Sequence, residues 1–400
     1  MERNFTSKMM LNVEGQSVGF VDDLLTVAVE RRASDIHIEP QADKTRIRLR
    51  IDGMLQHLCD LHKNDHDAVV SRIKVINNMD ITEKRVPQDG HFEKVINGKL
   101  VDLRTSSMPM VYGEKLVIRV LDKSNAFLAL DKLSFSQENL QAYRNLFTGS
   151  HGIVLVTGPT GSGKSTTLHA TLSELNKPEI NIITIEDPVE YQLEGVNQVT
   201  LNEKAGLGFA NGLRSVLRQD PDIIMVGEIR DEKTAKIAIQ AALTGHLVLS
   251  TLHTNNAVGA VTRLLDMGIE PYLLASCLRG VVAQRLVRAV CLHCAEKYEA
   301  RPAELACLHL PLTEKHMLQE TAGCIDCFGT GFCGRVALQE VLTVSENIKS
   351  LIMQGASESA MLEAARNEGF TSLFDDGVKK VLGGLTTLNE FMRVTESDRG

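Results

Sequence analysis

The sequence predicts an α/β protein with a largely parallel sheet, preceded by a smaller α/β domain. Between residues 133 and 290, short apolar runs alternate with segments of helical spacing, which is typical of a parallel sheet covered on both faces. The first of these runs leads into a glycine-rich loop and then a helix, the context of a phosphate-binding loop. Because ligands bind such sheets at the carboxyl ends of the strands, we expect the functional residues there.

Composition limits the classes of function. The 400 residues suffice for several domains, and a net charge of −8 with no Trp and five Tyr argues against a broad nucleic-acid surface. No apolar run approaches the ~20 residues that span a bilayer, and the polar start lacks a signal-peptide core. We therefore expect a cytoplasmic protein that reaches a membrane only through partners.

Residues 18–122 are predicted to form the smaller α/β domain, after an N-terminal tail of residues 1–17. Helical spacing predicts helices over residues 18–29 and 68–76. Alternating apolar and polar residues predict strands over residues 35–39, 46–51, 100–104 and 115–121. Turn signals stand at Asp52-Gly53 and at residues 87–90. Residues 123–134 are the predicted linker.

Residues 135–290 form the predicted nucleotide-binding domain. Its apolar strands are expected at residues 153–156, 180–185, 223–226 and 247–251. The phosphate loop that follows the first strand consists of Gly158, Pro159, Thr160, Gly161, Ser162, Gly163, Lys164, Ser165 and Thr166. Its backbone N–H groups are expected to surround the phosphates of ATP, with Lys164 on the β- and γ-phosphates and the Ser165 hydroxyl on Mg²⁺.

Acidic residues follow the second and third strands. Glu186, Asp187 and Glu190 crowd one strand end, which favours activating water or organising Mg²⁺, the alternative being a solvated acidic turn. The third strand ends in Gly227-Glu228, the shape of a Walker B segment with Gly where many NTPases place Asp. We therefore expect Glu228 to hold the Mg²⁺ shell, directly or through water.

Histidines stand at both ends of the fourth strand. His253, at the carboxyl end beside hydroxyl-bearing residues, is placed to sense a γ-phosphate through a hydrogen bond. His246, at the amino end, is equally well explained as a core residue.

Two C-x-x-C pairs lie in residues 291–335, which are predicted to be a loop-rich insert. The pairs, Cys291 with Cys294 and Cys324 with Cys327, suit one tetrahedral Zn²⁺ that receives two thiolates from each turn. Cys333, His293 and Cys307 are alternative ligands. After the insert, residues 336–394 are predicted to be helical, with helices at residues 348–353, 360–367 and 377–382.

The ordered set of motifs resembles the type II secretion and type IV pilus assembly ATPases. The resemblance covers residues 18–394. In chain order the matching stretches are residues 33–40, 85–90, 158–166, 186–188, 218–222, 226–231, 244–246, the paired C-x-x-C motifs, 329–335 and 386–390. The phosphate loop alone is generic, whereas the ordered set is specific.

This resemblance implies a RecA-like ATPase core, a PAS-like N-terminal domain, a zinc-bearing insert and a helical C-terminal part. It implies a homo-hexamer that hydrolyses ATP and drives pseudopilin or pilin subunits out of the inner membrane, bound to platform and cytoplasmic docking proteins. In the family, arginines matching Arg104 and Arg119 contact the nucleotide's phosphates, and Arg230 is similar to an arginine that helps to organise the site. RecA-like strand order favours Glu186 as the base and Glu228 for Mg²⁺, with the reverse open.

Two departures and two alternatives accompany the resemblance. Relatives usually carry an additional N-terminal docking domain, so this chain is expected either to be trimmed or to engage its platform differently. Pilus retraction motors generally lack the zinc insert, so the cysteines favour secretion or pilus assembly. The alternatives are a RecA-like nucleic-acid translocase, for DNA uptake or transfer, and an ATP-gated scaffold that does not hydrolyse ATP.

Overall fold

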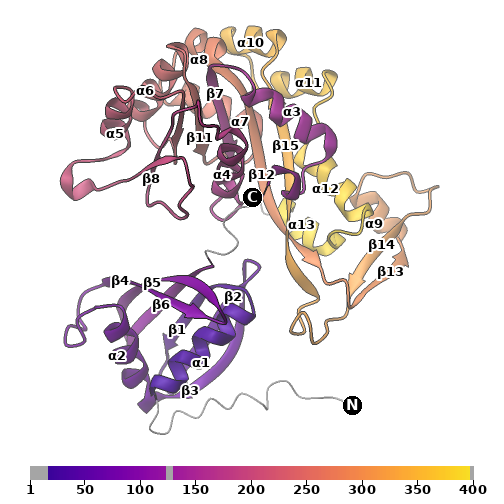
Figure 1. Cartoon of the computed structure of the whole chain (residues 1–400). Helices are drawn as coiled ribbons and strands as arrows, with labels where there is room; N and C mark the ends of the chain where they lie inside the picture. Colours follow the sequence, from indigo (N-terminus) through magenta and orange to yellow (C-terminus); the bar gives the residue numbers. More distant parts are fainter. Residues whose placement is uncertain (1–16, 123–128, 397–400) are drawn as a thin grey trace. The chain divides into compact units, whose positions relative to one another are not determined.

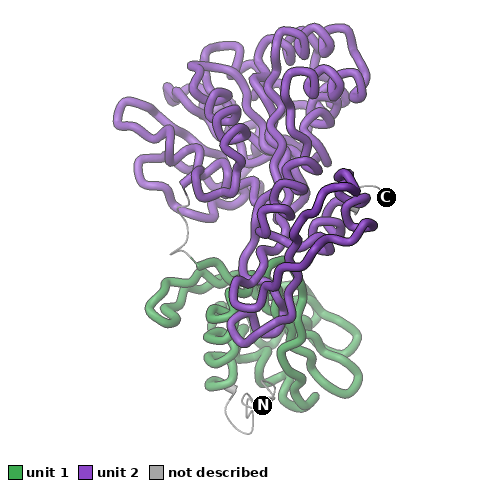
Figure 2. Tube along the Cα trace, turned by 90° about the vertical axis from the view of Figure 1, so that its right-hand side faces the viewer, with its two compact units in different colours: residues 1–126 green, residues 127–400 purple. Residues whose placement is uncertain are grey.

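The computed structural model describes residues 17–122 and 129–396. The chain forms two compact units, residues 1–126 and residues 127–400, which Figure 1 shows as a ribbon and Figure 2 in green and purple. Residues 1–16 of the predicted tail and residues 123–128 of the predicted linker lie outside the described residues. The domain bounds given above stay predictions.

Residues 17–122 of the first unit form an antiparallel sheet with two α-helices, in the strand order β3-β2-β1-β6-β5-β4. Its elements are α1 (Ser17–Glu30), β1 (Ala33–Pro40), β2 (Lys44–Ile51), β3 (Met54–His62), α2 (His66–Ile76), β4 (Gln88–Ile96), β5 (Lys99–Met110) and β6 (Gly113–Asp122). Alternate side chains of the strands, such as Ile36, Ile38 and Leu49, are buried with residues of both helices. The opposite face carries ion pairs such as Arg48 with Glu39, as expected of a sheet with one solvated face.

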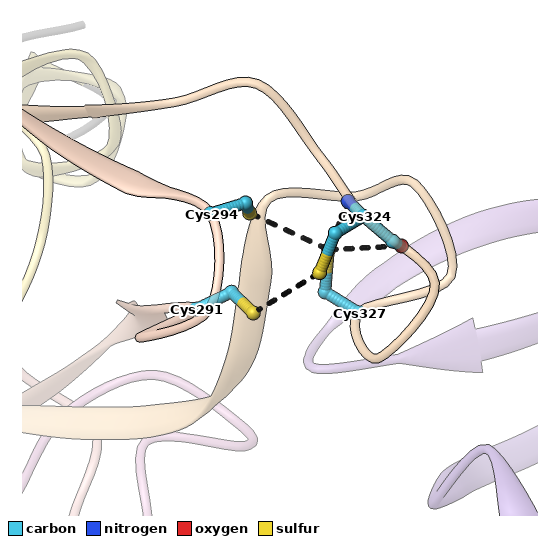
Figure 3. A group of neighbouring side chains, drawn as sticks. All are labelled: Cys291, Cys294, Cys324 and Cys327. Atoms are coloured by element: carbon cyan, nitrogen blue, oxygen red, sulfur yellow. Dashed lines mark hydrogen bonds between the residues drawn. The ribbon is translucent and has the colours of Figure 1, made fainter.

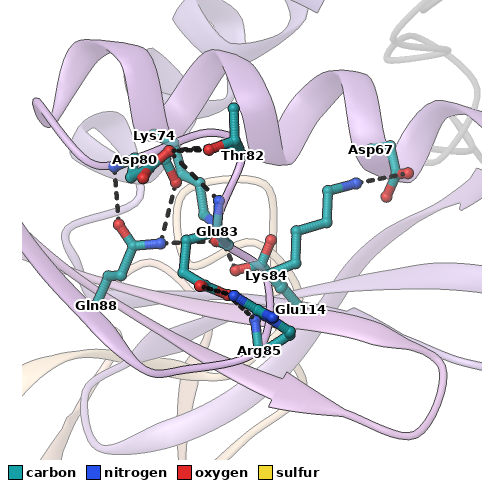
Figure 4. Close-up of polar contacts among 9 residues, drawn as sticks. All are labelled: Asp67, Lys74, Asp80, Thr82, Glu83, Lys84, Arg85, Gln88 and Glu114. Carbon is teal, nitrogen blue, oxygen red and sulfur yellow. Dashed lines mark hydrogen bonds and ion pairs between the residues drawn. The ribbon is translucent and has the colours of Figure 1, made fainter.

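The turn predicted at residues 87–90 is wrong, because Gln88 begins β4. The chain reverses direction earlier, over residues 80–83. There the Gln88 side-chain amide accepts from Asp80 N at 2.8 Å and donates to the carbonyls of Asp80 and Glu83 (Figure 4). Gly90 is explained by close packing, since a Cβ there would lie 2.6 Å from Asn77 Cβ. Strands β3 and β4 were not anticipated.

A buried ion pair stabilises the segment in which the chain reverses before β4. Lys74 Nζ lies 2.6 Å from Glu114 Oε1 and donates to Glu83 O at 2.7 Å, as Figure 4 shows. Both charged side chains are almost fully buried, so each depends on the other for its charge to be tolerated.

The second unit is organised around a seven-stranded sheet in the order β15-β12-β7-β11-β10-β8-β9. Its strands are β7 (Gly152–Thr157), β8 (Ile182–Glu186), β9 (Asn197–Thr200), β10 (Ile223–Val226), β11 (Leu247–Leu252), β12 (Leu278–Val290) and β15 (Phe332–Thr343). All neighbouring strands are parallel except β12 and β15. The predicted α/β class with a largely parallel sheet is therefore confirmed.

Helices cover both faces of this sheet (Figure 1). One face packs against α5 (Phe209–Val216), α6 (Glu232–Leu243), α7 (Ala257–Asp266), α8 (Pro271–Cys277), α10 (Glu346–Met353) and α11 (Glu358–Asn367). The other face packs against α3 (Gln137–Phe147) and α4 (Lys164–Leu175). The carboxyl ends of β7, β8, β10 and β11 thus meet at one edge of a buried sheet.

The segment with the cysteines connects β12 to β15 and has structure of its own. It contains β13 (Ala295–Glu299), α9 (Pro302–Cys307) and β14 (Met317–Thr321), and β13 pairs with β14. Its apolar residues share a core with α12 (Leu373–Leu382) and α13 (Leu388–Glu396). Strand β15 begins in the predicted insert and continues into the predicted helical part, so the stretch after residue 335 also supplies a strand. Strands β12 and β15 and helix α13 were not anticipated.

No helix among residues 17–122 and 129–396 is both long and apolar enough to cross a bilayer.

Candidate nucleotide site and metal site

The phosphate loop lies between the end of β7 and the start of α4. Gly158, Gly161 and Gly163 have φ angles of 149°, 80° and 87°, a region that side-chain-bearing residues rarely occupy. Gly163 is the N-cap of α4, so the first N–H groups of that helix open toward the loop. Ser165 is exposed in the first turn of the helix. The predicted strand, loop and helix are all present.

Lys164 folds back over the loop. Its Nζ donates to Gly158 O at 2.7 Å and to Pro159 O at 3.0 Å. The pKa of Lys164 is lowered to about 8, mainly by burial, with Glu228 opposing the shift and Arg285 adding to it. A phosphate group placed here would stabilise the charged ammonium form and raise its pKa again.

Glu228 follows β10 at the same edge of the sheet. Its carboxylate lies 2.5 Å from Arg230 and 3.5 Å from His253 Nε2, and both partners are largely exposed. Burial and the charge of Lys164 lower the pKa of His253 despite the nearby Glu228. The structure therefore brings together Lys164, Glu228, Arg230 and His253.

Glu186, at the end of β8, is buried and has partners on both oxygens. Oε1 accepts from Thr184 at 2.7 Å and from Gln198 at 3.1 Å, while Oε2 accepts from His169 at 3.1 Å. Burial alone would raise the pKa of Glu186, but these hydrogen bonds outweigh it and the pKa is lowered. Because His169 belongs to α4, Glu186 ties β8 to the helix that begins in the phosphate loop.

Three other predicted residues lie at the border of this group or beyond it. Asp187 is exposed directly after β8 and close enough to Arg230 to interact with it electrostatically, and Glu190 is half-buried four residues after Glu186. His246 precedes β11 and lies at the opposite edge of the sheet, where its Nδ1 is 2.9 Å from Ala241 O. The expectation that functional residues cluster at the carboxyl ends does not hold for His246.

Arg104 and Arg119 belong to the first unit, whereas the phosphate loop belongs to the second. They are direct cross-strand partners on β5 and β6. Like charges opposite one another repel, and here acidic neighbours offset the repulsion. Arg104 lies 3.7 Å from Asp102, and Arg119 lies 3.6 Å from Asp35.

Several residues of the site had no sequence signal. His169, Thr184 and Gln198 hold Glu186. Gln284 on β12 donates to Ser162 O at 2.6 Å, although it lies 122 residues from that serine in the chain. Such contacts depend on the strand order of the sheet, which local patterns do not specify.

The four predicted cysteines converge in the insert, as Figure 3 shows. The sulfur of Cys324 lies 3.7 Å from those of Cys291 and Cys327, and Cys294 Sγ is 3.8 Å from Cys327 Sγ. Four thiolates around Zn²⁺ at ~2.3 Å would lie about 3.8 Å from one another, so the spacing fits a tetrahedral ion. Backbone N–H groups of Cys324 and Gly331 donate to Cys327 Sγ at 3.1 and 3.2 Å, which favours a thiolate. Cys307 and Cys333, two of the alternative ligands, are exposed and lie outside this group.

A family comparison decides the assignment. The sequence profile of the family described as type II/IV secretion system protein matches residues 13–393. The chain belongs to this family. The resemblance predicted from the motifs is thereby confirmed.

Relatives within the family carry secretion names. The chain is 48% identical over 381 residues to type II secretion system protein E of Aeromonas hydrophila, covering 95% of this chain and 76% of that one. It is 48% identical over 379 residues to type II secretion system ATPase E of Vibrio cholerae serotype O1, covering 95% of this chain and 75% of that one. The predicted ATPase role is confirmed, and these relatives do not favour the nucleic-acid translocase.

Solved structures agree with the fold. The chain is similar to the pilus retraction motor PilT with bound ADP, with a TM-score of 0.62, 26% identity, and coverage of 93% of this chain and 96% of that one. The ATPase DotB of Legionella pneumophila has a TM-score of 0.68 at 22% identity, with coverage of 95% and 96%, which shows a shared fold.

Proposed function

We propose that this protein is the ATPase motor of a type II secretion machine, in which ATP hydrolysis drives the assembly of a pseudopilus and the export of proteins. The observation that carries the proposal is a phosphate loop with Glu228 at one sheet edge, in a chain 48% identical to a type II secretion system ATPase. Type IV pilus assembly is the second candidate, because the motifs resemble both kinds of ATPase and the chain is similar to the pilus retraction motor PilT.

The phosphate loop binds the nucleotide. The backbone N–H groups of the loop, which Pro159 lacks, surround the phosphates, Lys164 neutralises the β- and γ-phosphates, and the Ser165 hydroxyl would hold Mg²⁺. The φ angles of the loop glycines and the exposed hydroxyl of Ser165 support these roles. Asp187 and Glu190 border the site, and Mg²⁺ supplies charge neutralisation at the phosphates when bound.

Of the two acids, Glu228 acts on the attacking water and Glu186 is a positioning residue. This differs from the assignment that strand order favoured, in which Glu186 is the base and Glu228 holds Mg²⁺. Its support is that both oxygens of Glu186 accept hydrogen bonds from buried partners, whereas Glu228 contacts exposed side chains that are free to rearrange. A general base must have an oxygen within hydrogen-bonding reach of the water.

Cationic residues complete the site. Arg230 and His253 contact Glu228 and respond to the γ-phosphate. Arg104 and Arg119 are phosphate-binding residues, as the family resemblance implies. The support for the last two is their cross-strand pairing, which gathers two guanidinium groups at one place on the sheet.

The insert holds one structural Zn²⁺ through Cys291, Cys294, Cys324 and Cys327. The mutual distances of the sulfurs support this proposal.

The chain is divided into four domains. Residues 18–122 form a PAS-like domain, residues 135–290 the RecA-like core, residues 291–335 the insert and residues 336–394 the helical C-terminal part. The chain works as a homo-hexamer in the cytoplasm, peripheral to the inner membrane through platform and docking proteins.

The test replaces the native gene with the Lys164→Ala version in the source strain and scores secreted proteins and surface pili side by side. Loss of exported proteins with pili intact is the expected result. Loss of pili alone would identify a pilus assembly motor, and loss of neither would overturn the motor assignment.

A further inference from the structure

A glutamine that is distant in sequence from the phosphate loop contacts that loop directly. Gln284 of β12 is buried, with only 3% of its surface exposed. Its Nε2 donates to Ser162 O at 2.6 Å, and its Oε1 accepts from Thr167 Oγ1 at 2.8 Å. One amide group therefore bonds both the tip of the loop and the first turn of α4.

A second glutamine fixes the orientation of this amide. Gln339, the cross-strand partner of Gln284 on β15, is fully buried and its Nε2 lies 3.3 Å from Gln284 Oε1. With hydroxyl and amide donors at the oxygen and a carbonyl acceptor at the nitrogen, only one orientation satisfies all three contacts. Gln339 is itself held, because its backbone N donates to Asp376 at 2.8 Å.

The loop glycines fit closely around Gln284. A Cβ on Gly158 would lie 2.4 Å from Gln284 O, and a Cβ on Gly163 would lie 2.7 Å from Gln284 Nε2. Nothing lies within 4 Å of the corresponding position at Gly161. Two of the three loop glycines are thus needed for contact with Gln284 as well as for their φ angles.

We propose that Gln284 is a positioning residue for ATP binding, which sets the shape of the phosphate loop before the nucleotide arrives. The inference rests on the proposed nucleotide site. A loop already in its binding shape loses less conformational entropy on binding, and the benefit appears as affinity. A buried polar pair that only stabilises the fold would leave the affinity of the folded protein unchanged.

The test uses matched threonines on α4. Thr167→Val removes the hydroxyl that donates to Gln284, whereas Thr171→Val, one turn later and equally buried, removes a hydroxyl that bonds Tyr143 and Thr167 O. Binding of a fluorescent ATP analogue and amide exchange over residues 158–167 are measured for the full chain. Thr167→Val should weaken binding by roughly 2- to 10-fold and speed exchange in the loop, while Thr171→Val should do neither.

Two further variants sharpen the outcome. Gln284→Leu should weaken binding by roughly 10- to 100-fold, because both hydrogen bonds are lost. Equal affinities of Thr167→Val and Thr171→Val, with unchanged affinity in Gln284→Leu, would overturn the positioning role. Lys164→Ala separates the two proposals: if it also binds the analogue normally, the nucleotide site itself is wrong, whereas a loss confined to Lys164→Ala rejects Gln284 alone.

Discussion

The phosphate loop and the four-cysteine cluster are both tight turns shaped for a ligand, but they are stabilised in different ways. The loop is held from outside, by Gln284 on a neighbouring strand and by the hydrogen bond of Thr167 to the same amide. The cysteines contact one another and the backbone of their own turns. The contacts of the loop thus come from the surrounding protein, whereas the proposed Zn²⁺ would hold the cysteine cluster together.

This difference predicts opposite responses to ligand removal. The loop should keep its shape without nucleotide, since its contacts are all within the protein. The cysteine insert should lose its order without metal, because the folding free energy of such sites comes largely from the ion.

The largest expected effect is that of breaking the metal site. Cys327→Ser, or strong chelation, should abolish the binding of the proposed Zn²⁺ and unfold the insert. A structural zinc contributes on the order of 10 kcal/mol to the folding free energy of small domains. Elemental analysis and limited proteolysis within residues 295–323 measure this. Cys307→Ser, an exposed cysteine outside the cluster, is the control and should keep one zinc. Carefully reduced protein without zinc would reject the site.

At the nucleotide site, substitutions of Glu228 and Glu186 should differ in their effect on kcat. Glu228→Gln should lower kcat for ATP by about 10²–10⁴-fold while nucleotide still binds, because the base is lost but the loop is intact. Glu186→Gln keeps a similar shape and should retain much more activity. Steady-state phosphate release and analogue binding measure the two quantities. The opposite ranking of the two variants would restore Glu186 as the base.

A smaller effect comes from pH. The pKa of Lys164 is lowered to about 8, and bound phosphates would raise it, so binding takes up a proton. ATP affinity should then fall by about tenfold between pH 7 and pH 9, as the free lysine loses its charge. Titrations across this range test the fall. The residual affinity of Lys164→Ala should stay flat, and a flat profile in the unaltered protein would contradict the lowered pKa.

The smallest effect distinguishes the glycines of the loop. Gly161→Ala meets no neighbouring atom and should cost only the ~1–2 kcal/mol of a left-handed alanine. Gly163→Ala would add a collision with the Gln284 amide and should weaken nucleotide binding more. Analogue binding to both variants measures the difference, and equal losses would indicate that the contact with Gln284 does not shape the loop.

The sequence predicted those parts of the molecule that depend on local pattern. Short apolar runs predicted β7, β10 and β11, and the phosphate-loop motif predicted the glycine-rich loop between β7 and α4. The spacing of the cysteines predicted a cluster that the structure brings together.

What escaped prediction depends on contacts between distant segments. Strand β12 lies between β7 and β15, and this strand order is what places Gln284 under the loop. The turn predicted at residues 87–90 was wrong for a similar reason. Gly90 is required by close packing against Asn77, not by a turn. The partners of Glu186 come from α4, β8 and β9, and no local pattern joins these elements.

The central claim is that the protein hydrolyses ATP at the site around Lys164, where the carboxyl ends of the strands meet. Its most direct test is phosphate release by purified unaltered protein and by Lys164→Ala under identical conditions, with Cys307→Ser as a folded control. The account predicts turnover in the unaltered protein and the control, and none above background in Lys164→Ala. An unchanged rate in Lys164→Ala would contradict it.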